Sequence, residues 1–296
     1  MEIGLIGMGK MGLNIAMNMR RNDVSVIGFD VQNDAARYAE NQGIPQAVSV
    51  EDLVSSLSVP RMIWMMLPAG KITRQMVQNL TELLHAGDIV LDGGNSFYED
   101  SVCNYEMLKR HGIHFFDVGT SGGMDGALHG ANFMIGGDEQ IFRLIEDLFK
   151  KIAQEGGYLY TGNPGSGHYL KMVHNGIEYG MMQAIAEGFD LLQHSPYSYE
   201  NAAVAELWNH GSVIRSWLME LAADAFQKDP QLSGIKGIMY ASGEGQWTVE
   251  EALKRKVAIP VITAALMMRY RSLEEDTFTG KVVASLRKGF GGHKTA

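Results

Sequence analysis

The chain has 296 residues, of which 46% are hydrophobic, a share that argues against intrinsic disorder and allows about two domains. The formal net charge of −9 argues against nucleic acid or an anionic membrane surface as partner, although a local cluster of cations can still bind a small anion. The single cysteine, Cys103, rules out an intrachain disulfide and fits a reducing compartment. The sequence contains no run of about 18 apolar residues, so we expect no membrane span. The N-terminus opens directly into an apolar run without the features of a signal peptide, so we expect a cytoplasmic protein.

The first half of the chain alternates short apolar runs with helical stretches, a pattern typical of a parallel α/β sheet. The expected strands are residues 3–6, 24–29, 62–67, 89–92, 114–118, 133–135 and 158–160. Helices are expected between them, for example at residues 11–21, 72–84 and 102–110. We therefore predict a dinucleotide-binding domain of the Rossmann type over residues 1–164.

The pattern changes at the Gly/Pro-rich segment 162–167, which predicts a hinge between two domains. A long helical stretch then runs to about residue 193. Further helices are predicted at residues 200–209, 213–226, 249–256 and 260–270. The second domain, residues 165–296, is therefore predicted to be all-α and to end in a short Gly-rich tail.

A glycine-rich motif, Gly7-Met8-Gly9-Lys10-Met11-Gly12, lies between the first predicted strand and the first predicted helix. In a G-x-G-x-x-G motif the first glycine permits a tight turn, the second lets a pyrophosphate approach the backbone, and the third allows close packing of helix and strand. The phosphates would lie at the positive end of the helix. The alternative interpretation is a simple turn without a ligand.

Asp30 lies at the end of the second predicted strand, 23 residues after Gly7. A carboxylate there accepts hydrogen bonds from the adenosine ribose hydroxyls and repels a 2′-phosphate. The next residues, Val31 and Gln32, supply no arginine to pair with such a phosphate. The sequence therefore favours NAD over NADP, while FAD stays open from this motif alone.

Four polar residues follow one another at helical spacing in the long predicted helix: Lys171, His174, Asn175 and Glu178. The spacing i, i+3, i+4 and i+7 places them on one helix face, which Tyr179 extends. Such a stripe is normally apolar in an amphipathic helix. A polar stripe with apolar residues elsewhere predicts a buried helix that lines a cavity, whereas the alternative is a solvated face.

Gly176, in the middle of this helix, costs up to about 1 kcal/mol relative to alanine, which indicates close approach by a ligand or another backbone. The chemistry that fits the polar face is removal of hydride from a secondary alcohol. Lys171, once uncharged, would take the hydroxyl proton, and His174 beside it would favour the uncharged form. Lys171 would then return the proton to the carbonyl oxygen during decarboxylation, and Glu178 would protonate carbon on the enediol.

Residues 171–180 closely resemble the catalytic segment of the 6-phosphogluconate dehydrogenases. The further matching motifs occur in family order and cover nearly the whole chain: residues 92–96, 121–123, 167–168, 245–248 and 287–293. The resemblance implies oxidative decarboxylation of 6-phosphogluconate to ribulose 5-phosphate, in the pentose phosphate pathway or in gluconate use. It also implies a homo-oligomer (dimer or tetramer), and it favours NAD as cofactor, since NADP-using members carry an Asn-Arg-Thr where this chain has Asp30-Val31-Gln32. We expect no metal.

The same resemblance implies a role for each matching residue, with Lys171 as general base and Glu178 as general acid. Residues expected to hold the anionic sugar-acid phosphate are Asn95, Ser121, Gly122, Gly123, His174, Asn175, Tyr179, Arg271, Arg287 and His293. Tyr179 and Arg271 would bind its phosphate, and the tail residues Arg287 and His293 would complete the site of a neighbouring subunit. Residues expected to contact NAD are Gly7, Met8, Gly9, Lys10, Met11, Gly12, Asp30, Leu67, Pro68, Ala69 and Asn95.

Alternative interpretations exist for several of these residues. Asn95 would cap a helix, and residues 121–123 would form only a flexible turn. Arg271 would form a solvated pair with Arg269, and the tail would be disordered. Each of these alternatives removes a residue from the site without changing the fold.

The sequence departs from the family pattern in ways that affect function. Longer members carry a duplicated helical domain, whereas this chain has room for one copy and resembles the short bacterial type. Many members have a phosphate-binding Lys-Gly-Thr where this chain has Ser242-Gly243-Glu244, which loses a cation and adds an anion. Two competing functions stay open: a β-hydroxyacid dehydrogenase of the same superfamily, and an inert protein that binds NAD or a sugar phosphate.

Overall fold

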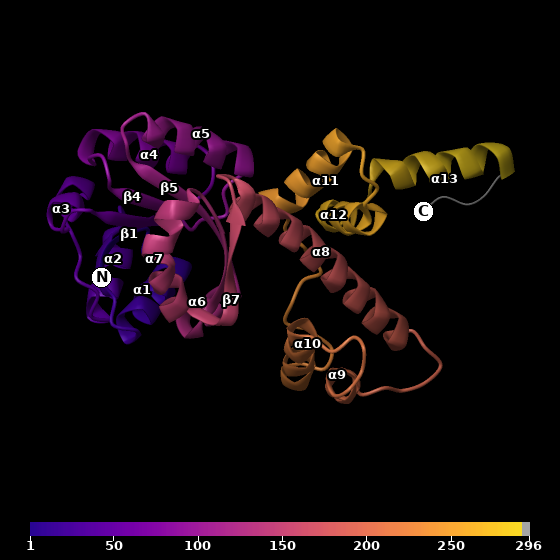
Figure 1. Ribbon diagram of the computed structural model, residues 1–296. Coiled ribbons are helices and arrows are strands. Elements are labelled where there is room, and N and C mark those ends of the chain that lie inside the picture. The colour runs from indigo at the N-terminus through magenta and orange to yellow at the C-terminus, as the bar shows by residue number, and fades with distance from the viewer. Residues whose placement is uncertain (292–296) are drawn as a thin grey trace. The chain divides into compact units, whose positions relative to one another are not determined.

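The computed structural model describes the backbone of residues 1–291 and the side chains of residues 1–288. The chain divides into two compact units, Met1–His174 and Asn175–Ala296, which are described separately below. Figure 1 labels the helices and strands of both. Among the described residues, no helix combines the length and the apolar character needed to cross a membrane.

The first unit contains a seven-stranded sheet in the order β2-β1-β3-β4-β5-β6-β7. The strands are β1 (Glu2–Ile6), β2 (Ser25–Phe29), β3 (Met62–Met65), β4 (Ile89–Asp92), β5 (His114–Ser121), β6 (Ala131–Gly136) and β7 (Ala153–Gly162). The chain crosses from one side of β1 to the other between β2 and β3. In open α/β sheets this switch in strand order is where dinucleotides bind.

One neighbouring pair of strands departs from the predicted parallel sheet. Strands β5 and β6 pair antiparallel, with Asp117 opposite Gly136, while the other neighbouring pairs are parallel. The connection between them, residues 122–130, is shorter than the roughly dozen residues that a parallel crossover needs. The sheet is therefore mostly parallel.

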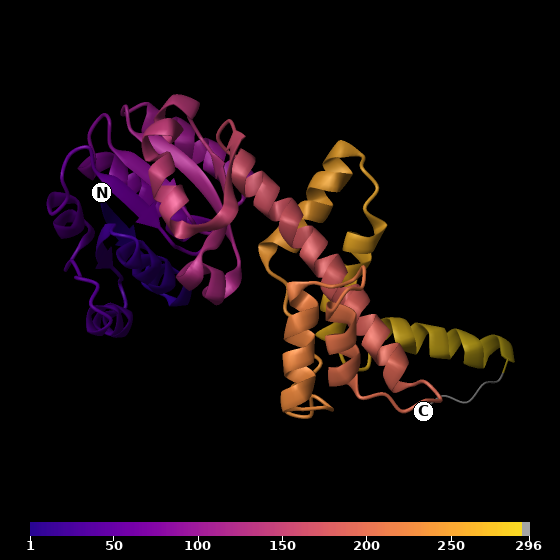
Figure 2. The same cartoon turned by 60° about the horizontal axis from the view of Figure 1, so that its bottom comes forward.

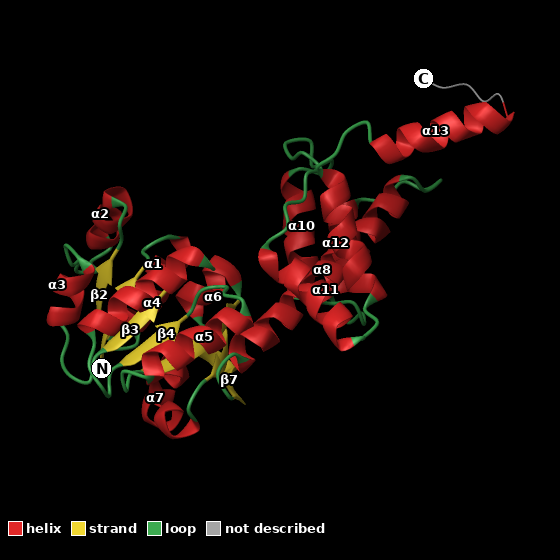
Figure 3. Cartoon of the chain, turned by 90° about the horizontal axis from the view of Figure 1, so that it is seen from above, coloured by secondary structure: helices red, strands yellow, loops and turns green. Residues whose placement is uncertain are grey.

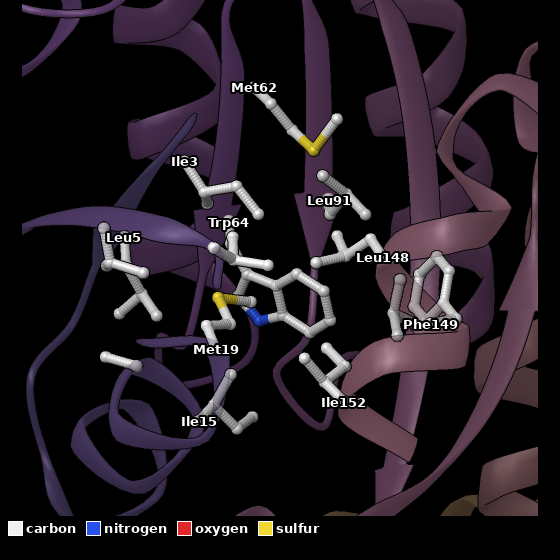
Figure 4. Close-up of a cluster of buried hydrophobic side chains, with 14 of the residues drawn as sticks. Ile3, Leu5, Ile15, Met19, Met62, Trp64, Leu91, Leu148, Phe149 and Ile152 are labelled. Carbon is white, nitrogen blue, oxygen red and sulfur yellow. The ribbon is translucent and has the colours of Figure 1, made fainter. Parts of the chain in front are cut away.

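Helices cover both faces of this sheet (Figure 3). They are α1 (Lys10–Arg21), α2 (Asn33–Asn41), α3 (Val50–Ser55), α4 (Lys71–Leu83), α5 (Tyr98–Lys109), α6 (Gly123–His129) and α7 (Glu139–Ile152). Alternate residues of β3 point to opposite faces, so Trp64 enters one core while Ile63 and Met65 enter the other. Figure 4 shows the Trp64 ring among Met19 of α1 and apolar side chains of α7. Two apolar cores therefore hold the sheet rigid between two layers of helices.

Helix α5 has a buried and an exposed side. Ser101, Asn104 and Leu108, spaced i, i+3 and i+7, are buried against the rest of the unit. Cys103, on the opposite side of the helix, is exposed. This helix directly precedes β5 in the sequence and is in contact with it.

The described part of the second unit is helical. Its elements are the second half of α8 (Ser166–Gln193), followed by α9 (Asn201–Asn209), α10 (Trp217–Lys228), α11 (Gly243–Arg255), α12 (Pro260–Ser272) and α13 (Phe278–Gly291). Helices α9 and α10 lie side by side (Figures 1 and 2). Their core is small: Phe189 of α8 packs with Ala205, Met219 and Ala223. The prediction of an all-α second domain therefore agrees with the described residues.

Candidate active site

The predicted cofactor segments share one edge of the sheet. Residues 7–12 follow β1, Asp30 follows β2, residues 67–69 follow β3 closely, and Asn95 follows β4. Strands β1 to β4 are mutually parallel, so their carboxyl ends meet at this edge. The structure thus brings together every segment that the sequence assigns to the dinucleotide.

The glycine-rich loop has the geometry that a pyrophosphate requires. Gly7 has a φ of +99°, which favours glycine. A Cβ atom at Gly12 would collide with the backbone oxygen of Gly7, whereas one at Gly9 would meet nothing within 4 Å. Gly9 is also the N-cap of α1, which has no side-chain cap and no acidic residue in its first turn. The open space at Gly9 and the positive end of α1 fit a bound phosphate.

Asp30 connects this loop to the end of β2. Its Oδ2 accepts a hydrogen bond from the Met8 amide at 2.7 Å, and its Oδ1 accepts one from the Gln32 amide at 2.8 Å. Each carboxylate oxygen can accept further hydrogen bonds, so ribose hydroxyls can still bind. Met8 is only 2% exposed, so it presents little surface to a ligand. The next side chain, Val31, is 81% exposed and carries no charge.

Lys171 is buried on the second turn of α8, with 6% of its surface exposed. A Cβ atom at Gly119 of β5 would lie 2.5 Å from the Cβ of Lys171 and 2.9 Å from the Gly167 oxygen. Glycine at position 119 therefore lets the helix lie directly on the strand. The predicted burial of Lys171, which its use as a base requires, is present.

His174 and Ser121, both predicted substrate residues, contact each other. The His174 Nε2 and the Ser121 Oγ lie 3.2 Å apart. Gly122, in the left-handed conformation with a φ of 106°, is the N-cap of α6, which begins at Gly123. Residues 121–123 thus form a strand-to-helix turn beside His174.

Asn175 and Glu244 form a buried pair in the second unit. The Asn175 Nδ2 donates to the Glu244 Oε1 at 3.0 Å, and Thr248 Oγ1 donates to the Glu244 backbone oxygen at 2.7 Å. Asn175 is 8% exposed and Glu244 4%. A carboxylate only accepts hydrogen bonds, so it turns the amide nitrogen of Asn175 toward itself and leaves the amide oxygen for other partners.

Tyr179 is held by Ser242, the N-cap residue of α11. Its hydroxyl lies 3.0 Å from the Ser242 Oγ and accepts the Ser242 amide at 2.9 Å. The guanidinium of Arg269 lies 3.6 Å from the centre of the Tyr179 ring, a cation–π contact. Tyr179, Ser242 and Arg269 therefore form one polar group on α8, α11 and α12.

Arg271, the predicted phosphate ligand, makes a different contact. Its side chain is exposed and donates to the Glu274 backbone oxygen at 2.7 Å. The arginine that contacts Tyr179 is Arg269, which sequence reasoning set aside. A signal was present: Ala265 and Leu266 are the buried residues of α12, and Arg269 follows them at i+4 and i+3 on the same face.

The remaining predicted residues are distributed as follows. Asn95 is exposed and does not cap α5, whose N-cap is Phe97. Glu178 is half-buried on α8, about two turns after Lys171. Arg287 is exposed on α13, and His293 lies outside the described residues. Among the described residues, no three histidine, cysteine, aspartate or glutamate side chains are grouped to hold a metal ion.

Gly176 is closely approached by side chains of two other helices. A Cβ atom there would lie 2.7 Å from the Thr248 Cγ2 and 3.3 Å from the Ile262 Cγ2. A glycine in the middle of a helix predicts close approach by another group, and side chains of α11 and α12 supply that approach. Glycine at this position therefore serves helix packing.

Comparison with known proteins decides the family. Residues 2–162 match the family model of the NAD binding domain of 6-phosphogluconate dehydrogenase, and residues 167–288 match that of the 6-phosphogluconate dehydrogenase C-terminal domain. The chain belongs to the 6-phosphogluconate dehydrogenase family. The resemblance drawn from residues 171–180 is therefore confirmed.

Several 6-phosphogluconate dehydrogenase family relatives resemble the chain over its whole length. The Bacillus subtilis (strain 168) protein YqeC is 52% identical over 295 residues, which cover 100% of this chain and 99% of YqeC. The NAD(+)-dependent, decarboxylating 6-phosphogluconate dehydrogenase of Haloferax volcanii is 39% identical, covering 100% of this chain and 99% of the relative. The Plasmodium falciparum 6-phosphogluconate dehydrogenase structure aligns with a TM-score of 0.86 at 29% identity, covering 98% of this chain and 65% of that longer one.

Proposed function

We propose that the protein oxidises 6-phospho-D-gluconate and decarboxylates the product to D-ribulose 5-phosphate and CO2, with NAD as the electron acceptor. The observation that carries the proposal is the buried Lys171 against Gly119, with the His174–Ser121 pair beside it. Glu178 follows on the same helix face. A helix whose polar face is exposed to solvent would not bury Lys171 against Gly119.

The cofactor would be held by residues 7–12, Asp30, residues 67–69 and Asn95, and when bound it supplies the acceptor for the hydride. Lys171 takes the proton from the substrate hydroxyl as hydride leaves carbon. It then donates that proton to the new carbonyl oxygen, which favours loss of CO2. Glu178 donates a proton to the enediol carbon while the now uncharged Lys171 takes back the proton of the enediol hydroxyl, which leaves the ketose.

The groups around Lys171 and Glu178 would position the substrate. Ser121 and His174 would bind the carboxylate end or neighbouring hydroxyls, with Gly122 and Gly123 supplying backbone amides. Asn175, oriented by Glu244, presents its amide oxygen to a substrate hydroxyl. Tyr179 and Arg269 would bind the phosphate, together with Arg271 and with Arg287 and His293 of a neighbouring subunit.

The preference for NAD rests on Asp30, whose charge repels a 2′-phosphate, and on the uncharged Val31 after it. The Haloferax volcanii relative is named as NAD(+)-dependent, which supports the same choice. We also propose the cytoplasm as the compartment and a homo-oligomer as the active form. The apolar side chains exposed on α12 and α13, such as Val261 and Phe278, support association.

One assay tests the reaction. Purified protein is supplied with NAD and either 6-phosphogluconate or unphosphorylated gluconate, and NADH and CO2 are measured together. Equal yields of the two products from 6-phosphogluconate support the proposal. NADH without CO2 would instead indicate a β-hydroxyacid dehydrogenase, and no turnover of either acid would indicate a binding protein.

Lys171→Met tests the base in the same assay. Loss of general acid–base catalysis is expected to lower kcat by about 10²- to 10⁴-fold. Lys151→Met, which alters an exposed lysine at the end of α7, serves as the matched control and should keep wild-type kcat. A wild-type kcat in Lys171→Met would contradict the proposed mechanism.

A further inference from the structure

A cluster of buried polar side chains lies beneath the first turn of α8. Asp92 of β4 and Asp117 of β5 are register partners in adjacent parallel strands, and both are 0% exposed. His168 is 1% exposed and Ser101 0%. The proposed reaction assigns no role to any of these four residues. Burying two carboxylates costs free energy unless other groups bind them. Their partners are therefore the groups to identify.

Asp117 accepts hydrogen bonds from two amides at the start of α8. Its Oδ1 accepts the Gly165 amide at 2.7 Å, and its Oδ2 accepts the His168 amide at 2.8 Å. The first amides of a helix have no partner within the helix, and the helix dipole makes this end positive. Asp117 therefore caps α8 from the sheet and is itself stabilised by the helix.

Glycines remove every side chain that would separate this turn from the sheet. A Cβ atom at Gly136 of β6 would lie 2.6 Å from the Asp117 Oδ1 and 2.9 Å from the Gly167 amide nitrogen. A Cβ atom at Gly167 would lie 2.5 Å from the Asp117 backbone oxygen. The first turn of α8 thus rests directly on β5 and β6.

His168 connects the same turn to α5. Its Nδ1 lies 2.7 Å from the Ser101 Oγ, while its Nε2 has no hydrogen-bond partner among the described residues. Burial raises the pKa of Asp92, a positive charge on His168 lowers that pKa, and the charge of Asp117 raises it. The imidazole and the two carboxyl groups therefore influence one another electrostatically.

We infer that Asp117 and His168 are positioning residues, which fix the first turn of α8 so that Lys171, three residues after His168, keeps its place beside Gly119. The inference rests on the proposed function, in which Lys171 is the base. The place of the Lys171 Cβ is set by the helix backbone, and that backbone is fixed by the two Asp117 hydrogen bonds and the His168–Ser101 contact. A misplacement of about 1 Å in a reacting group costs on the order of 10²-fold in rate.

Asp88 provides a matched control for Asp117. It is also 0% exposed and also accepts two backbone amides, from Arg61 at 2.7 Å and from His85 at 2.9 Å. It precedes β4, at the opposite end of the strand from Asp92. Asp88 also pairs with the Arg61 guanidinium at 3.0 Å, so Asp88→Asn disturbs its surroundings at least as much as Asp117→Asn does, and only Asp117 contacts α8.

The kinetic test compares Asp117→Asn, His168→Leu and Asp88→Asn. We expect the first two to lower kcat by about 10- to 100-fold while KM for NAD changes by less than about twofold. Asp88→Asn should lose thermal stability but keep kcat within about twofold of wild type. His168→Asn, whose amide can still bond Ser101, should recover part of the kcat that His168→Leu loses. Wild-type kcat in Asp117→Asn and His168→Leu, or an equal loss in Asp88→Asn, would overturn the inference.

A milder variant covers the case in which these proteins do not fold. Ser101→Ala removes one hydroxyl and leaves His168 in place. It should lower kcat in the same direction by a smaller factor, and an unchanged kcat would contradict a positioning role for His168.

A second measurement needs no substrate. Amide hydrogen exchange of residues 165–173 should accelerate in Asp117→Asn and His168→Leu and stay unchanged in Asp88→Asn. Unchanged exchange in the first two would remove the structural basis of the inference. If wild-type protein fails to turn over 6-phosphogluconate, the proposed function fails, whereas the exchange result still decides whether Asp117 and His168 hold the helix.

Discussion

At the scale of single residues, the proposed preference for NAD rests on Asp30. Its carboxylate already binds the Met8 amide of the glycine-rich loop, so the charge is fixed beside the adenosine end of the proposed site. Val31, at 81% exposure, has open space around its side chain. A cation at position 31 would therefore reach a 2′-phosphate.

We expect Asp30→Asn combined with Val31→Arg to shift the preference toward NADP. Removing the carboxylate ends the repulsion of the 2′-phosphate, and arginine adds a bidentate partner for it. The ratio of kcat/KM with NADP to that with NAD should rise by at least about tenfold. Val48→Arg, at an equally exposed valine, should leave the ratio unchanged. A wild-type protein that already prefers NADP would show the interpretation of Asp30 to be wrong.

Asp92 gives the stability of the protein a predictable pH dependence. Burial raises the pKa of Asp92, so the folded protein binds this proton more tightly than the unfolded chain. The contribution to stability is fully present below the unfolded pKa of about 3.9 and is lost as the pH rises through the folded pKa.

Asp92→Asn removes this titration. The free energy of unfolding of wild type minus that of the variant should therefore be largest near about pH 4 and should decrease as the pH rises. Urea unfolding at several pH values measures the difference. A difference that increases with pH would contradict the raised pKa.

Some of these residues could be predicted from the sequence, and others could not. Lys171 and Asp30 were predictable because each belongs to a local motif with a defined spacing. Asp117 was not, because its partner Gly165 lies 48 residues away in sequence. In the sequence Asp117 is an ordinary acidic residue at a strand, and only the close approach of α8 buries it.

At the scale of elements, α8 contains glycines with opposite expected effects on stability. Gly176 is buried against Thr248, whereas a Cβ atom at Gly188 of the same helix would meet nothing within 4 Å. Gly176→Ala should destabilise the protein by about 1–3 kcal/mol through overpacking. Gly188→Ala should stabilise it by about 0.5–1 kcal/mol through helix propensity. Thermal unfolding of both variants checks the contrast, and equal shifts of both would contradict the packing argument.

The elements themselves were largely predictable, and their ends less so. All seven predicted strands are present, because each contains a short apolar run. Residues 213–226 were predicted as one helix, whereas α10 begins at Trp217 because the Ser216 side chain caps it. Helix α11 begins at Gly243, six residues before the prediction at 249, because Gly-Glu-Gly resembles a loop in sequence.

At the scale of the whole molecule, the order of the two domains was predictable from the change of pattern near residue 164. The boundary itself stays a prediction, since α8 continues from one compact unit into the other. The role of the C-terminal tail also stays a prediction. Arg287 is exposed on α13, as expected of a residue that acts on another subunit.

Mixing two inactive variants tests whether the tail acts on a neighbouring subunit. Lys171→Met has an intact tail but no base, and a chain truncated after residue 286 has the base but lacks Arg287 and His293. If the tail completes a neighbouring site, mixed oligomers contain some complete sites and part of the activity returns. Mixing Lys171→Met with Glu178→Gln truncated at 286 should restore nothing. Activity in the truncated chain alone would contradict the role of the tail.

Cys103 makes a further experiment straightforward. It is the single cysteine of the chain and lies exposed on α5. A maleimide dye will therefore attach once per chain, at a known place, without any engineered cysteine. Populations labelled with donor and acceptor dyes, once mixed, would report the exchange of subunits through energy transfer and count the copies in an assembly. The natural sequence thus already contains a single attachment point for a dye that reports the distance between subunits.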